Sequence, residues 1–157
     1  KENWKDTMSV VKFDVKKFNE IDIKTLHNIF LIRAEVFIVE QQCAYQDIDG
    51  KDTNSTHIIG KIKEEIIAYS RIMNLNNDFC SIGRVLVKKD LRKKGLGIKL
   101  MKKSIEEATK LYNKKKIKIS AQEYLKNFYE DLGFKHTGKS YLEDGIPHIE
   151  MIATLEP

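Results

Sequence analysis

Cysteine and proline are scarce in this 157-residue sequence, which contains two of each. The cysteines, Cys43 and Cys80, lie in unrelated contexts without the paired spacing of a zinc site or of a disulfide framework. A cysteine-rich secreted scaffold and a cysteine-ligated metal are therefore excluded, and no metal is expected. We expect two reduced thiols of the kind common in cytosolic proteins.

Long apolar runs are also missing. The longest, Ile29–Ile32 and Val36–Val39, are far shorter than the ~20 residues needed to cross a bilayer. The charged stretch Lys1–Asp6 lacks the apolar core of a signal peptide. We therefore expect no membrane partner and a cytoplasmic location.

Repeats, low-complexity segments and linker-like shifts in composition are absent as well. With 157 residues and 41% hydrophobic content, the chain suits one domain with a proper core. We predict a single domain over residues 1–157, whose first ~7 residues form a disordered or extended tail.

The sequence carries more positive than negative charge, with a net charge of +5 and a pI near 9.0. An anionic ligand fits this charge, but surface lysines explain it equally well. The basic clusters Arg92–Lys94 and Lys114–Lys116 have no aromatic residues between their charges, unlike proteins that stack single-stranded nucleic acid. The pattern argues against nucleic acid as a partner.

A basic turn with two glycines follows a short β-branched strand around Val85 and Val87. After the turn comes a helix whose apolar residues recur every three or four positions. Gly95 and Gly97 let a ligand approach the backbone closely, and the first amides of a helix lack internal partners. Because the helix dipole and the cations Arg92–Lys94 both favour an anion, this turn predicts a phosphate-binding site.

Two common phosphate-binding motifs do not fit this turn. A Walker loop needs Gly, four residues and then Gly-Lys-Ser or Gly-Lys-Thr, and a dinucleotide fingerprint needs a third glycine, which Ile98–Leu100 does not supply. The turn contains instead Arg-x-x-Gly-x-Gly, from Arg92 to Gly97, between a strand and a helix.

The segment Gln42–Ser55 is polar, irregular and rich in aspartate. Its aspartates, Asp47, Asp49 and Asp52, are the ligand type of a calcium loop. An EF-hand loop that opened at the first of them would need glutamate where Ile58 stands, so calcium is excluded. We predict a structured loop at the rim of a cleft.

The order of predicted elements indicates the fold class. Helices are expected over Ile23–Gln41 with Asp22 as the cap, after Gly95, and over Tyr124–Leu132. Strands are expected over Ser9–Phe13, Thr56–Ile62, Ile66–Leu75, Phe79–Lys88, Ile117–Ala121, Phe134–Tyr141 and His148–Leu155. This order of meander, helix, strand, helix and strand pair predicts an α+β fold with helices on both faces of a mixed sheet.

Two motifs at this separation resemble the GNAT family, the Gcn5-related N-acetyltransferases. Arg92–Gly97 resembles the family's pyrophosphate loop, and Asn127–Phe134 resembles its second motif, which ends in Leu-Gly-Phe. The segments Arg33–Gln41, Tyr45–Asp52 and Asp144–Ile149 are similar to ElaA-type members of the family. The resemblance implies a mixed, mostly antiparallel sheet and acetyl-CoA as the cofactor.

The resemblance also implies roles for single residues. Backbone N–H groups of Val85–Val87 would polarise the acetyl carbonyl, and Asn127 would contact the pantetheine arm. Tyr129 would give a proton to the departing thiolate, although a core aromatic with its hydroxyl at the surface is the structural alternative. The expected cofactor-binding residues are Val85, Leu86, Val87, Arg92, Lys93, Lys94, Gly95, Leu96, Gly97 and Asn127.

The acceptor site and its general base are left open by the sequence. Arg33 and Glu40 interrupt the apolar stripe of the first predicted helix, so each should be paired or line a cleft. The candidate bases are His57, His148, Glu35, Glu40 and Glu123. The candidate acceptor-site residues are Arg33, His57, Arg71, Gln122 and His148.

Two classes of function are consistent with these features. The first is an acetyl-CoA-dependent N-acetyltransferase, a monomer or homodimer, that moves an acetyl group directly to an amine of a small molecule or peptide in a ternary complex. The second is a CoA-binding or nucleic-acid-binding module without turnover. The presence of Tyr129 favours the enzyme.

Overall fold

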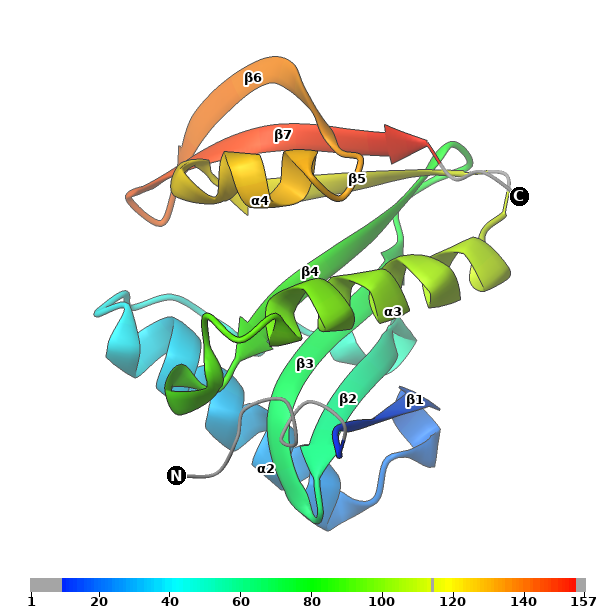
Figure 1. Ribbon diagram of the computed structural model, residues 1–157, viewed down its shortest axis with the longest axis vertical. Helices are drawn as coiled ribbons and strands as arrows, with labels where there is room; N and C mark the ends of the chain where they lie inside the picture. Colours follow the sequence, from blue (N-terminus) through cyan, green and yellow to red (C-terminus); the bar gives the residue numbers. More distant parts are fainter. Residues whose placement is uncertain (1–9, 114, 155–157) are drawn as a thin grey trace.

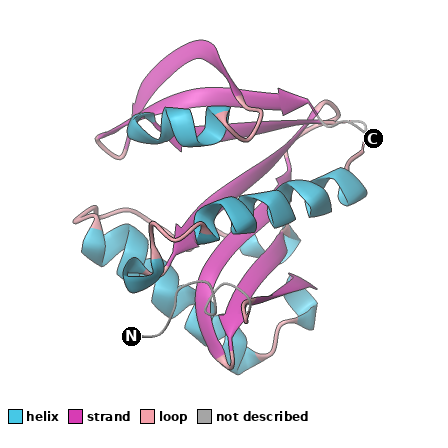
Figure 2. Ribbon diagram, viewed as in Figure 1, coloured by secondary structure: helices cyan, strands magenta, loops and turns pink. Residues whose placement is uncertain are grey.

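The computed structural model describes residues 10–113 and 115–154. A seven-stranded sheet runs through this part of the chain in the order β1-β2-β3-β4-β5-β7-β6 (Figures 1 and 2). Its strands are β1 (Lys12–Lys17), β2 (Thr56–Ile62), β3 (Glu65–Asn74), β4 (Phe79–Val87), β5 (Lys116–Gln122), β6 (Lys135–Glu143) and β7 (Ile146–Thr154). The tail expected at residues 1–7 lies outside the described residues.

Neighbouring strands of the sheet pair antiparallel, except for β4 and β5. Those two strands are parallel and pair only at one end, through Phe79 with Lys116 and Cys80 with Ile117. Beyond these two pairs they diverge (Figure 1). The predicted mixed, mostly antiparallel sheet is confirmed.

Helices cover both faces of the sheet. On one face, α2 (Ile23–Arg33) continues into η2 (Ala34–Glu40), a stretch of π-helix. On the other face lie α3 (Leu96–Leu111) and α4 (Lys126–Glu130), both drawn in front of the sheet in Figure 1. Four 3₁₀ turns complete the elements: η1 (Phe18–Glu20), η3 (Asp52–Asn54), η4 (Lys89–Leu91) and η5 (Glu123–Leu125). Within the described residues, no helix has the length and apolar character that a membrane crossing requires.

Each face of the sheet has its own apolar cluster. The larger one joins the strands to α3 and α4 and contains Leu100 and Tyr129. The smaller one lies under α2 and η2 and contains Ile29. Ile58 and Ile59 belong to different clusters because side chains alternate along a strand.

Element boundaries agree with the sequence where a cap or a turn marks them. Asp22 caps α2 by accepting a hydrogen bond from the Thr25 amide at 2.8 Å, as predicted. The strand expected at Ser9–Phe13 begins instead at Lys12 and ends at Lys17, because β2 supplies its pairing partners from Lys61 to Thr56. The last two strands also run further toward their shared turn than predicted, since the ladder between them extends to the turn itself.

Candidate active site

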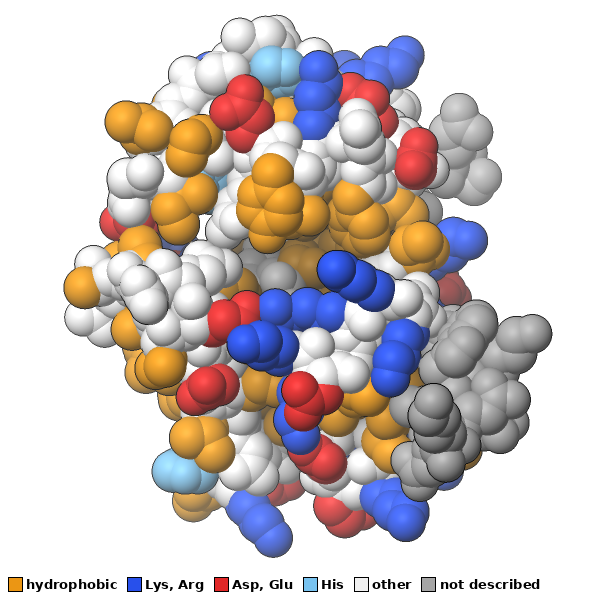
Figure 3. Space-filling view, turned by 60° about the vertical axis from the view of Figure 1, so that its left-hand side comes forward, with side chains coloured by type: hydrophobic (Ala, Val, Ile, Leu, Met, Phe, Trp, Pro, Cys, Tyr) orange, Lys and Arg blue, Asp and Glu red, His pale blue; other side chains and the backbone are white. Residues whose placement is uncertain are grey.

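A cavity of about 870 Å³ opens where β4 and β5 diverge. Its walls come from β4, the end of β5, the start of α3, η2, α4 and the turn between β6 and β7. Figure 3 shows this face hollowed, with Lys and Arg side chains along one edge of the hollow. A ligand can therefore enter between the two strands without breaking a hydrogen-bonded ladder.

Strand β4 presents unpaired backbone to this cavity. Past Cys80, its edge toward β5 has no ladder partner among the described residues. On its other edge, the register with β3 shifts between Tyr69 and Arg71, and Arg84 near the resulting bulge has a positive φ of 51°. The stretch Val85–Val87, expected to lie along the cofactor, forms part of the wall.

The N-terminus of α3 forms another part of the wall. Gly95 caps the helix at a φ of 82°, a left-handed conformation that suits glycine, and no side chain within residues 10–113 and 115–154 caps the first amides. Gly95 and Gly97 both line the cavity, whereas the Leu96 side chain is buried in the core. A Cβ placed on Gly97 would stand 3.5 Å from the ring of Phe128, so backbone and aromatic ring bound the cavity here.

Arg92, the first residue of the predicted phosphate loop, is held by three contacts. Its Nη1 and Nη2 donate to the two carboxylate oxygens of Glu40 at 2.5 and 3.0 Å, and its Nε donates to the carbonyl of Val87 at 2.9 Å. The sequence indicated that Glu40 needs a partner, but not that the partner lies 52 residues away. Beside this pair, Lys93 lies on the cavity wall and Lys94 does not.

Tyr129 reaches the cavity from α4. Its ring is fixed by edge-on contacts with Phe128 and Phe134, at centroid distances of 5.0 and 5.8 Å. Burial raises the pKa of Tyr129 to about 12, so the hydroxyl is protonated at neutral pH. It makes no hydrogen bond to any residue that the structure describes. Asn127, two residues earlier, is exposed and lies off the wall.

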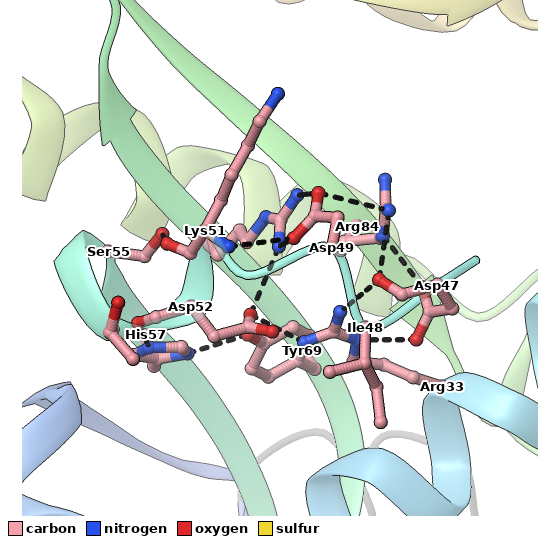
Figure 4. A network of polar contacts seen from close by, with 12 residues as sticks. Arg33, Asp47, Ile48, Asp49, Lys51, Asp52, Ser55, His57, Tyr69 and Arg84 are labelled. Carbon is pink, nitrogen blue, oxygen red and sulfur yellow. Dashed lines mark hydrogen bonds and ion pairs between the residues drawn. The ribbon is translucent and has the colours of Figure 1, made fainter.

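A buried ionic network holds the loop between η2 and β2. Three arginines and three aspartates meet there and together carry no net charge: Arg33, Arg71, Arg84, Asp47, Asp49 and Asp52 (Figure 4). Arg33 Nε binds Asp47 at 3.0 Å and its Nη1 binds Asp52 at 2.6 Å. Arg71 binds Asp49 at 2.5 Å and Asp52 at 3.1 Å. Arg84 Nε binds Asp47 at 2.7 Å.

This network accounts for the acidic character of the loop. Burial alone would raise the pKa of Asp49, but hydrogen bonds from Arg71 and the Lys51 amide, with the charge of Arg84, hold it well below its usual range. The negative charges of the loop aspartates are therefore balanced by arginines. In the described ranges, no group of three or more His, Cys, Asp or Glu residues is placed to hold a metal ion.

His57 is part of the same buried region (Figure 4). Its Nε2 lies 2.9 Å from the carbonyl of Asp52, which can only accept, and its Nδ1 lies 2.6 Å from the Tyr69 hydroxyl. Burial lowers the pKa of His57 and favours the neutral ring. His57, Arg33 and Arg71 thus lie in the network and off the cavity wall.

The other two candidate acceptor residues, Gln122 and His148, do line the cavity. At the end of the cavity lined by Gln122 and His148, opposite walls contact each other. Gln122 Nε2 donates to Gln41 Oε1 at 3.3 Å, and Cys43 Sγ lies 3.5 Å from the carbonyl of Asp144. The loop after η2 and the turn between β6 and β7 therefore close one side of the cavity.

Glu143 is a cavity residue that the sequence analysis did not single out. Its Oε2 lies 3.3 Å from Nε2 of His148. The available signal was the turn at Asp144 and Gly145, because such a turn folds the two strands back on each other and brings residues on either side of it together.

Comparison with known proteins agrees with this architecture. The family model for an acetyltransferase (GNAT) domain matches residues 19–155. A UPF0039 protein of Schizosaccharomyces pombe is 40% identical over 146 residues, which cover 92% of this chain and 97% of that protein. Protein ElaA of Escherichia coli is 41% identical over 137 residues, which cover 85% of this chain and 90% of that protein.

Two crystal structures share the fold. That of Escherichia coli ElaA has a TM-score of 0.87 at 37% identity and covers 91% of this chain and 99% of its own. That of an acyl-CoA N-acyltransferase from Pseudomonas aeruginosa has a TM-score of 0.86 at 32% identity, with the same coverage.

The family model spans most of the chain, and the fold agrees with it along nearly the whole length. The chain therefore belongs to the GNAT acetyltransferase family, as an enzyme of the ElaA-like type.

Proposed function

We propose that this chain transfers an acetyl group from acetyl-CoA directly to an amine while both are bound. The observation that carries the proposal is the divergence of β4 and β5, which opens one cavity lined by the N-terminus of α3 and by Tyr129. The Pseudomonas aeruginosa neighbour, named an acyl-CoA N-acyltransferase, supports the same class of cofactor.

The residues around the cavity fit acetyl-CoA in three respects. The uncapped amides after Gly95 suit a pyrophosphate, because they donate hydrogen bonds at the positive end of a helix dipole. The unpaired edge of β4 can hydrogen-bond the pantetheine amides in the way an added strand would. The cavity of about 870 Å³ falls within the usual range of about 300–1,000 Å³ for ligand sites.

In this proposal the chain positions the reacting atoms and moves protons. When bound, acetyl-CoA supplies an acetyl thioester. Backbone N–H groups of Val85–Val87 donate to the carbonyl oxygen as negative charge develops on it. The Tyr129 hydroxyl donates its proton to the departing sulfur. The proposed cofactor site consists of the wall residues Val85, Leu86, Val87, Arg92, Lys93, Gly95 and Gly97, and it also includes Lys94, Leu96 and Asn127, whose side chains lie off the wall.

The acceptor in this proposal is an amine of a small molecule or of a peptide. We also propose a cytoplasmic location and a monomer or homodimer. A CoA-binding or nucleic-acid-binding module without turnover is the competing function. Such a module has no use for the Tyr129 hydroxyl on its cavity wall, which is why we favour the enzyme.

Incubation with acetyl-CoA and a panel of alkylamines, amino acids and short peptides tests the proposal. We expect free thiol to appear only when both acetyl-CoA and an amine are present, and the acetylated amine to be found by mass spectrometry. Binding of acetyl-CoA without thiol release for any amine would overturn the transferase proposal in favour of the binding module.

A further inference from the structure

We propose that His148 is the general base that removes a proton from the acceptor amine, and that Glu143 is its positioning residue. The inference rests on the proposed function and names a proton acceptor within the same site. Among the residues that the structure describes, His148 is the one histidine on the cavity wall.

Two contacts decide which ring nitrogen of His148 can act. Nδ1 lies 2.7 Å from the carbonyl oxygen of Ile146, and because a carbonyl only accepts, Nδ1 carries the hydrogen. The neutral ring therefore has its lone pair on Nε2. That nitrogen lies 3.3 Å from Oε2 of Glu143, which also only accepts, so this contact is attractive only once Nε2 has taken up a proton.

Packing holds the ring in this orientation. The His148 side chain is 9% exposed and its ring stacks on Tyr141, with 6.2 Å between centroids and 15° between planes. Glu143 is 52% exposed, so its carboxylate keeps contact with solvent. The His148 ring is thus fixed in place, and the solvent-exposed carboxylate of Glu143 lies beside it, where a proton can pass to water.

The strand register places acid and base on opposite faces of the sheet. His148 pairs with Gln122 of β5 and with Tyr141 of β6, and residues paired across strands share a face. Tyr129 packs against the other face, in the cluster that contains Ala121. Because Ala121 and Gln122 both line the cavity, it reaches both faces at the open edge of β5. An amine can therefore approach the carbonyl from one side while the sulfur leaves toward the other.

The other candidate bases are either paired or off the cavity wall. Both carboxylate oxygens of Glu40 accept hydrogen bonds from Arg92. Three further candidates lie off the cavity wall: His57, Glu35 and Glu123.

The chemistry needs such a base because an alkylamine with a pKa of ~10.4 is mostly protonated at neutral pH. The ammonium group gives one proton to Nε2 of His148, which passes it to solvent. The neutral nitrogen forms the C–N bond, and the C–S bond breaks with its electron pair leaving on sulfur. Nitrogen then loses its second proton to solvent, the thiolate gains a proton from Tyr129, and solvent restores the Tyr129 hydroxyl.

The first test needs no acceptor. ¹⁵N NMR of the histidine-labelled chain should show that His148, when neutral, carries its hydrogen on Nδ1. His148→Gln assigns the signal by removing it. His136→Gln serves as the matched control, because His136 lies on β6 but not on the cavity wall. A neutral His148 with its hydrogen on Nε2 would overturn the proposal.

The second test compares two kinds of acceptor. His148→Gln should lower kcat by ~10²–10⁴ for an alkylamine, the range of a placed base, but only a few-fold for hydroxylamine, which is already neutral at the assay pH. His136→Gln should behave like the parent chain, and acetyl-CoA affinity should be unchanged in both variants. Equal losses for the two acceptors, or no loss at all, would overturn the base assignment.

The third test addresses Glu143. Glu143 and Tyr141 of β6 contact the His148 ring, and Asp144, Cys43 and Tyr124 line the same cavity. Glu143→Gln should lower kcat more for an alkylamine than for hydroxylamine, because the imidazolium loses its carboxylate partner, and should leave acetyl-CoA affinity unchanged. Equal losses for the two acceptors, or no loss at all, would overturn the positioning role.

The parent chain separates failure of this inference from failure of the proposed function. A parent chain that binds acetyl-CoA but acetylates no amine overturns the proposed function and the base assignment together. A parent chain that acetylates amines while His148→Gln does so equally well overturns the base assignment alone.

Discussion

His57 and His148 are both buried, but they differ in whether a ring nitrogen is placed to exchange protons. In His57 both ring nitrogens have protein partners, the Tyr69 hydroxyl and the carbonyl of Asp52. In His148 the carbonyl of Ile146 engages Nδ1, and Nε2 has only a partly exposed carboxylate beside it. The first can stabilise the fold but not exchange protons readily, whereas the second has a basic nitrogen at a cavity.

Replacing Tyr129 with phenylalanine separates an acid from a packing residue. Tyr129→Phe should lower kcat by about 10²-fold, the lower end of the range for a placed acid, since a CoA thiolate is a tolerable leaving group unaided. Acetyl-CoA affinity should change far less, because the proton matters mainly as charge develops on sulfur. Steady-state kinetics and calorimetric titration measure the two effects.

The fold itself should tolerate this change. The Tyr129 hydroxyl makes no hydrogen bond to a described residue, so its loss leaves no buried partner unsatisfied, and the ring contacts with Phe128 and Phe134 stay. A variant that turns over at the parent rate with an identified acceptor would show that Tyr129 only packs.

The buried His57 should make folding stability depend on pH. Its pKa is lowered in the folded state, so below about pH 6.5 the unfolded chain binds a proton that the folded chain does not. Stability should therefore fall as the pH falls from 7 to 5.5, because the unfolded chain takes up a proton on this residue and the folded chain resists it. Urea unfolding at the two pH values measures the loss.

The control for this effect is His57→Asn, which has no ionisable group at the site. The variant should be less stable than the parent at pH 7, because it breaks hydrogen bonds in the core, but its stability should change less between the two pH values. An equal pH dependence in both chains would contradict the assignment to His57.

At the residue scale, two charged residues on the apolar stripe of the first helix predicted that each would need a partner or a cleft. Arg33 and Glu40 had to be paired or face a cleft, and both are paired. Their partners could not be read from the sequence. Asp47 and Asp52 lie 14 and 19 residues from Arg33, and Arg92 lies 52 residues from Glu40, so the pairs exist only because the helix packs against the sheet.

Among the elements, the first helix shows where periodicity succeeds and where it falls short. Its start and its approximate end were predicted from the Asp22 cap and the apolar stripe. The change to π-helix at Ala34 was not predicted, because one wider turn leaves no mark in composition. This wider segment supplies Val36, Phe37 and Glu40 to the cavity wall, and π-helical turns often occur at functional sites.

The start of α3 allows a matched pair of variants. At Gly97 a single methyl group would make ordinary contact with Phe128 at 3.5 Å, whereas valine adds two more carbons where the pyrophosphate would approach. Gly97→Ala should keep acetyl-CoA binding within a few-fold. Gly97→Val should weaken it by about tenfold or more, equivalent to about 1.4 kcal/mol, as measured by calorimetric titration.

The thermal stability of both Gly97 variants controls for damage to the fold. Because the position lies at a helix start on a cavity wall, neither variant should lower the melting temperature by more than a few degrees. Unchanged acetyl-CoA affinity in Gly97→Val would remove the α3 start from the proposed site.

At the scale of the whole molecule, the cavity follows from the topology. Strands β1 to β4 form one antiparallel set and β5, β7 and β6 form another, and in the part of the chain that the structure describes two ladder pairs join them. Each set has its own helical cover, α3 and α2 for the first and α4 for the second (Figure 1). Because few backbone hydrogen bonds join the two sets of strands, the sheet can open at this junction. A large site can therefore exist within a small domain.

A ligand that fills this junction should stabilise the entire fold. Acetyl-CoA at a hundredfold excess over its dissociation constant should add about 2.7 kcal/mol to the free energy of unfolding. ATP and NAD at the same concentration should add less, because they offer phosphates but no pantetheine arm for the edge of β4. Thermal unfolding with each ligand measures the difference, and an equal shift with ATP would count against acetyl-CoA as the cofactor.

The sequence by itself determined the features that depend on neighbouring residues. Turn glycines, the Asp22 cap and the periodicity of apolar residues were enough for the order of elements, the fold class and the phosphate-binding turn, and two local motifs were enough for the family. Each of these signals acts within a few residues of the chain, which is why it can be read without a structure.

Only the tertiary structure decided how distant residues meet. It placed Arg33, His57 and Arg71 in a buried network, paired Glu40 with Arg92, and brought Cys43 to Asp144, 101 residues away. Burial and hydrogen-bond geometry arise when whole elements pack together, so no local pattern in the chain encodes which charge is matched by which partner.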